Sequence, residues 1–164
     1  YMSYVRNRGM EIQIARFHNI FGTEGSWNYG REKAPSAKCR KFAETPEGGE
    51  MEMWVDGEQT RSFLFVDECL EGVRRFMDSD FLGPVNIGSE EMVTINALAQ
   101  MAMDIAGKEI TINHIEGPLG VRGRNSDNRL IEEKLGWRPS LPLRGGMEKT
   151  FTWIRDQVEA ARKD

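Results

Sequence analysis

The stretch Arg16-Phe17-His18-Asn19-Ile20-Phe21-Gly22 decides the fold, together with the residues that lead into it. Apolar and polar residues alternate over residues 10–14, which is the period of a β-strand. His18 and Asn19 follow at the end of this strand, where α/β sheets place residues that contact ligands. We therefore predict a strand with a binding site at its carboxyl end. A hydrogen-bonded structural role is the alternative for His18.

Helix and strand patterns alternate outward from this stretch. Pro35 and Thr94 stand where helices begin, and Gly9 and Gly107 stand where helices end. Predicted helices cover residues 1–8, 35–44, 67–77, 95–106, about 127–135 and 146–162. Predicted strands cover residues 10–14, 50–55, 63–66, 85–88 and 110–114. The alternation predicts an α/β fold, with parallel strands where helices cross over.

Loops connect these elements, and one predicted helix has a clear apolar face. The predicted loops cover residues 22–30, 45–49 and the glycine-rich stretch 116–125. In the helix over 67–77, Leu70, Val73 and Met77 recur at helical spacing. We expect these three side chains to share one apolar face.

The composition excludes several classes of protein. The 164 residues include 22 Lys and Arg against 26 Asp and Glu, a net charge of −4, which argues against a general nucleic-acid binder. No apolar run approaches the roughly 18 residues that a membrane span needs. Cys39 and Cys69 lack metal-ligand spacing and cannot form a disulfide framework, which favours a reducing, cytoplasmic compartment and no metal. The chain begins with Tyr1 rather than Met, and we expect it to be a piece of a longer protein.

Basic residues gather in three places although the chain is acidic. Residues 31–41 hold five basic residues and one acidic residue, a net charge of +4. Arg122-Gly123-Arg124 is a second cluster, and Arg61 is a third candidate. These clusters suit one compact anion such as a diphosphate, and a solvated helix face is the alternative. If Lys33 lies in a cleft beside the other lysines of its run, like charges lower its pKa toward acid–base use.

Several further motifs follow in order: Gly57-Glu58-Gln59-Thr60-Arg61-Ser62-Phe63, Val66-Asp67-Glu68, Val85-Asn86-Ile87-Gly88-Ser89 and Leu135-Gly136-Trp137-Arg138-Pro139. With residues 16–22, this series resembles the extended short-chain dehydrogenase/reductases that act on nucleotide sugars, over nearly the whole chain. The resemblance implies the C-terminal part of an extended Rossmann-type α/β fold, mainly the sugar-nucleotide-binding domain. Rossmann strands and helices are expected at about residues 1–22 and 60–90.

Residues 30–35 and 120–128 narrow the resemblance to the epimerases that act on GDP-linked sugars. In such an enzyme NAD oxidises carbon 4 of the sugar, and the ketone acidifies the C–H bonds at carbons 3 and 5. A cysteine and a lysine then exchange protons, and NADH returns the hydride. Lys33 matches that catalytic lysine. Positions that contact the substrate are matched by Asn19, Glu32, Lys33, Ala34, Lys41, Gln59, Arg61 and Arg124.

The resemblance also marks what this chain lacks. The glycine-rich dinucleotide fingerprint, the Tyr-x-x-x-Lys pair and the catalytic cysteine of the family are not in the sequence, so we expect the main NAD site in an absent N-terminal half. Cys39 matches a position that is not catalytic, and Phe21-Gly22-Thr23 replaces the usual Tyr-Gly-Pro. The complete enzyme is expected to be a homodimer. The alternatives are a sugar-nucleotide-binding fragment without turnover, or another epimerase or dehydratase of the same family.

Overall fold

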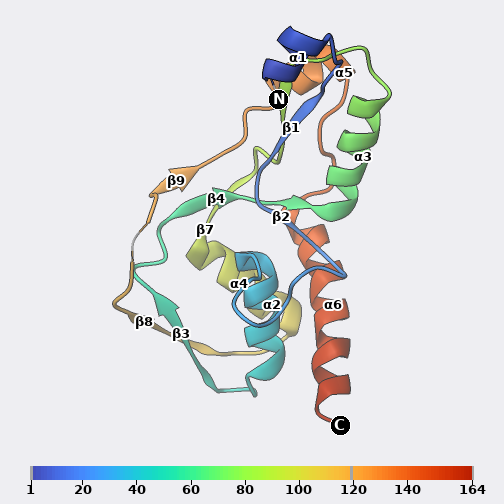
Figure 1. Ribbon diagram of the computed structural model, residues 1–164. Coiled ribbons are helices and arrows are strands. Elements are labelled where there is room, and N and C mark those ends of the chain that lie inside the picture. Colours follow the sequence, from blue (N-terminus) through green and yellow to red (C-terminus); the bar gives the residue numbers. More distant parts are fainter. Residues whose placement is uncertain (1, 119, 164) are drawn as a thin grey trace.

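The computed structural model describes residues 2–118 and 120–163, in which helices and strands alternate along the chain (Figure 1). The helices are α1 (Met2–Arg8), α2 (Ala34–Glu44), α3 (Val66–Met77), α4 (Ile95–Ala106), α5 (Arg129–Leu135) and α6 (Leu143–Ala161). The strands are β1 (Ile14–Phe17), β2 (Ile20–Phe21), β3 (Glu50–Trp54), β4 (Thr60–Ser62), β5 (Leu64–Phe65), β6 (Pro84–Ile87), β7 (Met92–Thr94), β8 (Thr111–Ile115) and β9 (Gly123–Arg124). Residues 1 and 119, which belong to a predicted helix and a predicted loop, lie outside the described residues.

Most strand pairs are parallel, as the alternation predicts. Strands β1 and β6, β2 and β5, and β3 and β8 pair in parallel. Strand β4 lies between β7, its antiparallel partner, and β9, its parallel partner. The predicted α/β class with parallel pairing is confirmed.

Local sequence signals account for the helix ends. Pro35 lies in the first turn of α2, where a missing backbone N–H costs nothing. The Thr94 side chain accepts a hydrogen bond from the Ala97 backbone N–H and caps α4. Gly107 ends α4 in the left-handed conformation at φ +64°, which glycine adopts without steric cost. The predicted ends of α4 are confirmed.

Two predicted strands have different bounds in the structure. The strand predicted over 10–14 begins only at Ile14, since the Gln13 side chain donates to the carbonyls of Phe76 and Ser79 and ties this segment to the end of α3. The strand predicted over 63–66 is only β5, Leu64–Phe65, because α3 already begins at Val66, and the preceding strand β4 was not predicted.

The apolar face predicted for α3 is wrong for Leu70 and Met77, whereas Val73 packs against a buried core. Leu70 and Met77 are 63% and 69% exposed, whereas the buried residues of this helix are Cys69, Gly72 and Phe76. The reason is a close approach at Gly72, where a Cβ atom would lie 2.7 Å from the Trp137 ring. The absence of a side chain lets Trp137 pack against the helix, which turns the opposite face to solvent.

Buried side chains form two cores, which correspond to the two ends of the molecule in Figure 1. The larger core lies among α2, α4, α6 and β3, and includes Phe42, Leu98 and Ile154. The smaller core lies among α3, α5, β5 and β6, and includes Ile87 and Ile131. Strand β5 joins them, since Leu64 belongs to the smaller core and Phe65 to the larger. No described helix is long and apolar enough to cross a bilayer.

The loop over residues 22–30 runs from β2 toward α2 and is anchored at both ends. At Gly22, φ is +155° and a Cβ atom would lie 2.5 Å from a methyl carbon of Val66, so only glycine fits. Further along, the Trp27 ring packs edge-on against the Trp153 ring of α6 at a centroid distance of 6.5 Å. These contacts fix the path of the chain that leads to Lys33.

Candidate functional site

The carboxyl end of β1 opens into a pocket of about 430 Å³, which we call the β1 pocket. It is lined by Arg16, Phe17, His18, Asn19, Asn86 and Arg124. Asn19 has a left-handed φ of +47°, which asparagine tolerates better than most residues, and its amide donates to the Ser62 carbonyl at 3.0 Å. The backbone N–H of His18 donates to the Ile87 carbonyl at 3.1 Å. The structure thus brings Asn19 and Arg124, two predicted binding residues, to one pocket.

Arg61 and Arg124 occupy paired positions on the neighbouring strands β4 and β9. The Arg61 guanidinium donates to the Thr60 carbonyl at 2.7 Å and to the Val121 carbonyl. Among the described residues, Arg124 forms no ion pair with a carboxylate. Like charges at paired positions repel each other, and a bound anion would relieve that repulsion. The pairing therefore brings two of the predicted anion-binding residues onto neighbouring strands.

Strand β9 itself was missed, because residues 116–125 were predicted to be a loop. Gly123 and Arg124 pair with Thr60 and Arg61, and a Cβ atom at Gly123 would lie 3.0 Å from the Thr60 hydroxyl.

The neighbouring Arg122 does not join this pair and instead forms an ion pair with Asp56 at 2.8 Å. The pKa of Asp56 is lowered first by the Glu58 backbone N–H and then by Arg122. The predicted Arg122–Arg124 cluster therefore does not act as one unit.

Lys33 lies at the N-terminal end of α2 and lines a second pocket of about 230 Å³, which we call the α2 pocket. The other lining residues are Ile20, Phe21, Gly22, Thr23, Gly25, Ser26, Arg31, Ser36 and Val66. Ser36 is 3% exposed and was missed by the sequence analysis. Its position one helical turn after Lys33 is the signal that could have identified it.

The basic run over 31–41 is divided by its helix rather than presented to one anion. Arg31 and Lys33 line the α2 pocket, but Lys38, Arg40 and Lys41 do not. The Lys41 ammonium donates to the Glu52 carbonyl at 3.4 Å. The basic residues of the run therefore do not share one pocket, and the two hypotheses, a single bound anion and a solvated helix face, stay predictions.

Lys38 is the lysine of this run that is buried, with 8% of its surface exposed. Burial lowers the pKa of Lys38 to about 8, and the nearby charge of Lys41 contributes to the shift. The sequence analysis expected such a shift at Lys33. Lys38 lies four residues before the apolar residue Phe42, and residues four apart share a helix face. This spacing is the signal from which the burial of Lys38 could have been predicted.

Glu32 forms an ion pair with Arg40 at 3.0 Å, and their side chains are only 6% and 19% exposed. Burial by itself raises the pKa of Glu32, but the residue's own backbone N–H and the Arg40 guanidinium lower the pKa more, so the net shift is downward. Gln59 is 7% exposed, and Ala34 packs against the larger core. Glu32, Ala34 and Gln59 line neither of the two pockets.

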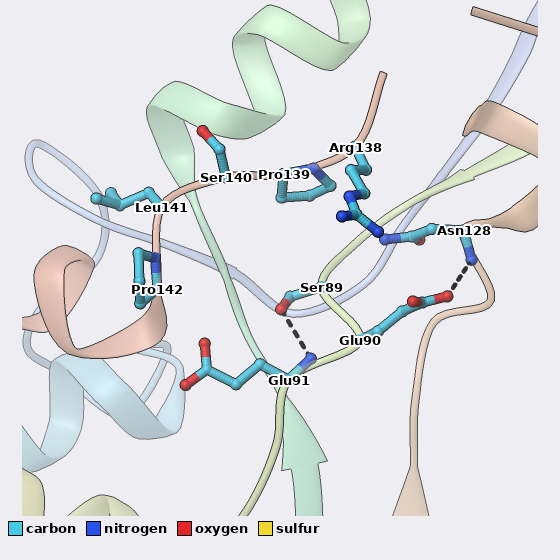
Figure 2. A pocket seen from close by; sticks show the side chains of 9 residues that line it. All are labelled: Ser89, Glu90, Glu91, Asn128, Arg138, Pro139, Ser140, Leu141 and Pro142. Atoms are coloured by element: carbon cyan, nitrogen blue, oxygen red, sulfur yellow. Dashed lines mark hydrogen bonds between the residues drawn. The ribbon is translucent and has the colours of Figure 1, made fainter. Parts of the chain in front are cut away.

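A larger pocket, of about 650 Å³, contains none of the predicted site residues (Figure 2). Several of its polar groups already accept hydrogen bonds from backbone N–H groups. The Glu90 carboxylate accepts from the Asn128 backbone N–H at 2.9 Å, and the Ser89 hydroxyl accepts from the Glu91 backbone N–H at 3.1 Å. The Glu91 carboxylate accepts from the Leu143 backbone N–H at 2.7 Å and caps α6. No group of His, Cys, Asp or Glu in the described part of the chain could hold a metal ion.

Comparison with known proteins places this geometry in context. Residues 2–88 match the model of the NAD dependent epimerase/dehydratase family. The chain is 54% identical over 156 residues to GDP-mannose 3,5-epimerase of Arabidopsis thaliana, covering 95% of this chain and 41% of that protein. It is 34% identical over 152 residues to UDP-glucuronic acid decarboxylase 6 of the same plant, covering 90% of this chain and 43% of the relative.

Among solved structures, UDP-glucose 4-epimerase of Thermotoga maritima superposes with a TM-score of 0.86 at 23% identity. That match covers 96% of this chain and 50% of the other, and it concerns the fold. The chain therefore spans less than half the length of the curated relatives it matches.

Proposed function

The chain belongs to the NAD dependent epimerase/dehydratase family, and from this premise we propose that it is the sugar-nucleotide-binding part of a GDP-mannose 3,5-epimerase, which converts GDP-mannose to GDP-L-galactose. The observation that carries the proposal is the presence of Asn19 and Arg124 together in the β1 pocket, with Arg61 paired to Arg124 on the neighbouring strand. The 54% identity to an enzyme of that name supports the choice of GDP-mannose over other nucleotide sugars.

Arg61 and Arg124 hold the diphosphate of the substrate. A guanidinium can hold two phosphate oxygens at once, and two guanidinium groups on paired strands match the two negative phosphates. The Asn19 side chain already uses its amide N–H, which leaves the amide oxygen to accept a hydrogen bond from a hydroxyl. Lys41, Glu32, Ala34 and Gln59 remain predicted contacts, on the strength of the resemblance.

Lys33 moves a proton at carbon 3 or carbon 5 of the sugar. The α2 pocket, about 230 Å³, is smaller than the roughly 300–1,000 Å³ of whole-ligand sites, so it suits one part of a nucleotide sugar. A lysine ammonium at such a pocket can protonate a carbanion next to a ketone, and the neutral amine can remove the proton. The second proton-transfer group, a cysteine by resemblance, is expected from outside this chain.

When NAD is bound, it supplies the redox chemistry at carbon 4, which is removal of a hydride and its later return. The residues present fit one edge of such a cofactor. The carboxyl ends of parallel strands are where α/β sheets bind dinucleotides, and His18 and Asn19 follow the end of β1. The sequence contains no Gly-x-Gly-x-x-Gly motif, so the remaining contacts are assigned to the absent N-terminal half.

The two cores support a division of labour within the chain. The smaller core is built largely from residues about 1–22 and 60–90, which we assign to the cofactor domain, and the larger core belongs to the substrate domain. We also propose that the complete enzyme is a cytoplasmic homodimer, on the strength of the family resemblance and of two buried free cysteines.

The test uses the gene product that carries this sequence, incubated with GDP-mannose and NAD. We expect GDP-L-galactose as product, and a raised KM for GDP-mannose in the Arg61→Ala and Arg124→Ala variants. Conversion of UDP-glucuronic acid instead would assign the chain to another reaction of the family. Tight binding of GDP-mannose without any product would favour the alternative, a sugar-nucleotide-binding protein without turnover.

A further inference from the structure

Arg40 connects helix α2 to the segment that precedes it. Its Nη2 atom lies 3.0 Å from Oε1 of Glu32, and its Nη1 atom lies 2.8 Å from Oε2 of Glu44. The inner pair, Arg40–Glu32, is largely buried, whereas the Glu44 side chain is 39% exposed. The inner pair is therefore screened less by solvent than the outer one.

The segment before α2 has little regular structure to hold it in place. Tyr29 and Gly30 both have left-handed φ values, +66° and +76°, so the chain turns sharply just before Arg31. Lys33 begins the helix without a side-chain hydrogen bond that caps it. The Glu32–Arg40 ion pair is thus the side-chain contact that fixes the residue next to Lys33.

We propose that Arg40 is a positioning residue of the active site, which holds Lys33 at the α2 pocket by anchoring Glu32. Without the guanidinium, a carboxylate that is 94% buried loses its ionic partner, and the segment must shift to rehydrate it. A shift of about 1 Å at a reacting group can cost roughly 10²-fold in rate. The chemical role of Lys33 rests on the proposed function, whereas the anchoring of residues 31–33 does not.

The kinetic test compares two variants in the intact gene product. In Arg40→Met we expect kcat to fall by about 10- to 100-fold, with a smaller rise of KM for GDP-mannose and with exchange of the C3 and C5 hydrogens with solvent deuterium slowed in parallel. Arg40→Lys, which keeps the charge, should recover part of kcat. Glu44→Gln, the matched control that removes only the outer partner, should keep kcat within about twofold.

A second measurement is independent of catalysis. Backbone amides of residues 31–33 should exchange with deuterated water faster in Arg40→Met than in the wild type, and at the wild-type rate in Glu44→Gln. If Arg40→Met does not fold, Glu32→Gln weakens the same pair from its other end and should give the same faster exchange.

The outcomes separate this inference from the proposed function. Unchanged amide exchange in Arg40→Met overturns the anchoring role, and so does an equal fall of kcat in Glu44→Gln. A rise of KM without a fall of kcat assigns Arg40 to binding and also overturns it. Absence of epimerase activity in the wild type refutes the proposed function, and the amide exchange then still decides whether Arg40 holds the segment.

Discussion

At the scale of single residues, Lys38 is the clearest case of a charged side chain whose burial disfavours the folded state. It is 8% exposed and its pKa lies near 8 instead of the ordinary 10.5. Between about pH 8 and pH 10.5 the unfolded chain keeps the proton that the folded chain has released, so stability rises with pH across this window. Below pH 8 the full penalty applies, at most about 3 kcal/mol from a shift of this size.

We therefore predict that Lys38→Met stabilises the protein at pH 7, by up to about 3 kcal/mol, and that the difference from wild type shrinks between about pH 8 and pH 10.5. Urea denaturation across this pH range measures the effect. Lys163→Met, at an exposed position, is the control and should change stability by less than about 0.5 kcal/mol. A destabilised Lys38→Met at pH 7 would show that the buried ammonium has a partner that compensates for its burial.

Lys33 and Arg124 should respond differently to substitution in the intact enzyme. Arg124→Ala loses a charge-assisted contact to phosphate, worth about 1.5–3 kcal/mol, and should mainly raise KM. Lys33→Ala should lower kcat by about 10²–10⁴ and slow the exchange of carbon-bound hydrogens with solvent deuterium, with a smaller effect on KM. Steady-state kinetics and deuterium incorporation distinguish the two. A Lys33→Ala enzyme with normal kcat would remove the catalytic role from this chain.

At the scale of elements, helix α2 depends on a distant lysine. The Lys108 ammonium donates to the carbonyls of Phe42, Ala43 and Thr45 at 2.9, 3.3 and 2.7 Å, which satisfies the open C-terminal end of the helix. We predict that Lys108→Met lowers the free energy of unfolding by about 1.5–3 kcal/mol, measured by urea denaturation. Gln100→Ala, which removes an exposed contact to Asp104, is the control and should have an effect below about 0.5 kcal/mol.

Elements also show what the sequence could predict. The ends of α4 follow from Thr94 and Gly107, because capping is a local interaction between neighbours in the chain. The pairing of Arg124 with Arg61 joins residues 63 positions apart, and no local pattern reports it. The buried face of α3 depends on Trp137, which is also distant in sequence. Asn19 was predicted from its place at the end of a strand and the catalytic role of Lys33 from resemblance, whereas the Glu32–Arg40 ion pair required coordinates.

At the scale of the whole molecule, the proposed function gives this chain one part of a reaction site. We predict that the 164-residue chain alone folds, shows no epimerase activity with GDP-mannose and NAD, and binds GDP-mannose more tightly than UDP-glucose. Circular dichroism, product analysis and calorimetric titration with both ligands test the three parts. Clear turnover by the pure chain would contradict the division of labour, and equal affinity for both ligands would contradict the preference for a GDP-linked sugar.

The edge-on pair of Trp27 and Trp153 gives the protein an intrinsic spectroscopic signal. Two indole rings 6.5 Å apart and inclined at 87° are close enough for their electronic transitions to couple, which produces a paired positive and negative band in circular dichroism. Trp27→Phe and Trp153→Phe should abolish that band, whereas Trp54→Phe, at an exposed position, should preserve it. Because Trp27 lies in the loop that leads to Lys33, a change in the band on adding GDP-mannose would report movement of this loop without any attached label.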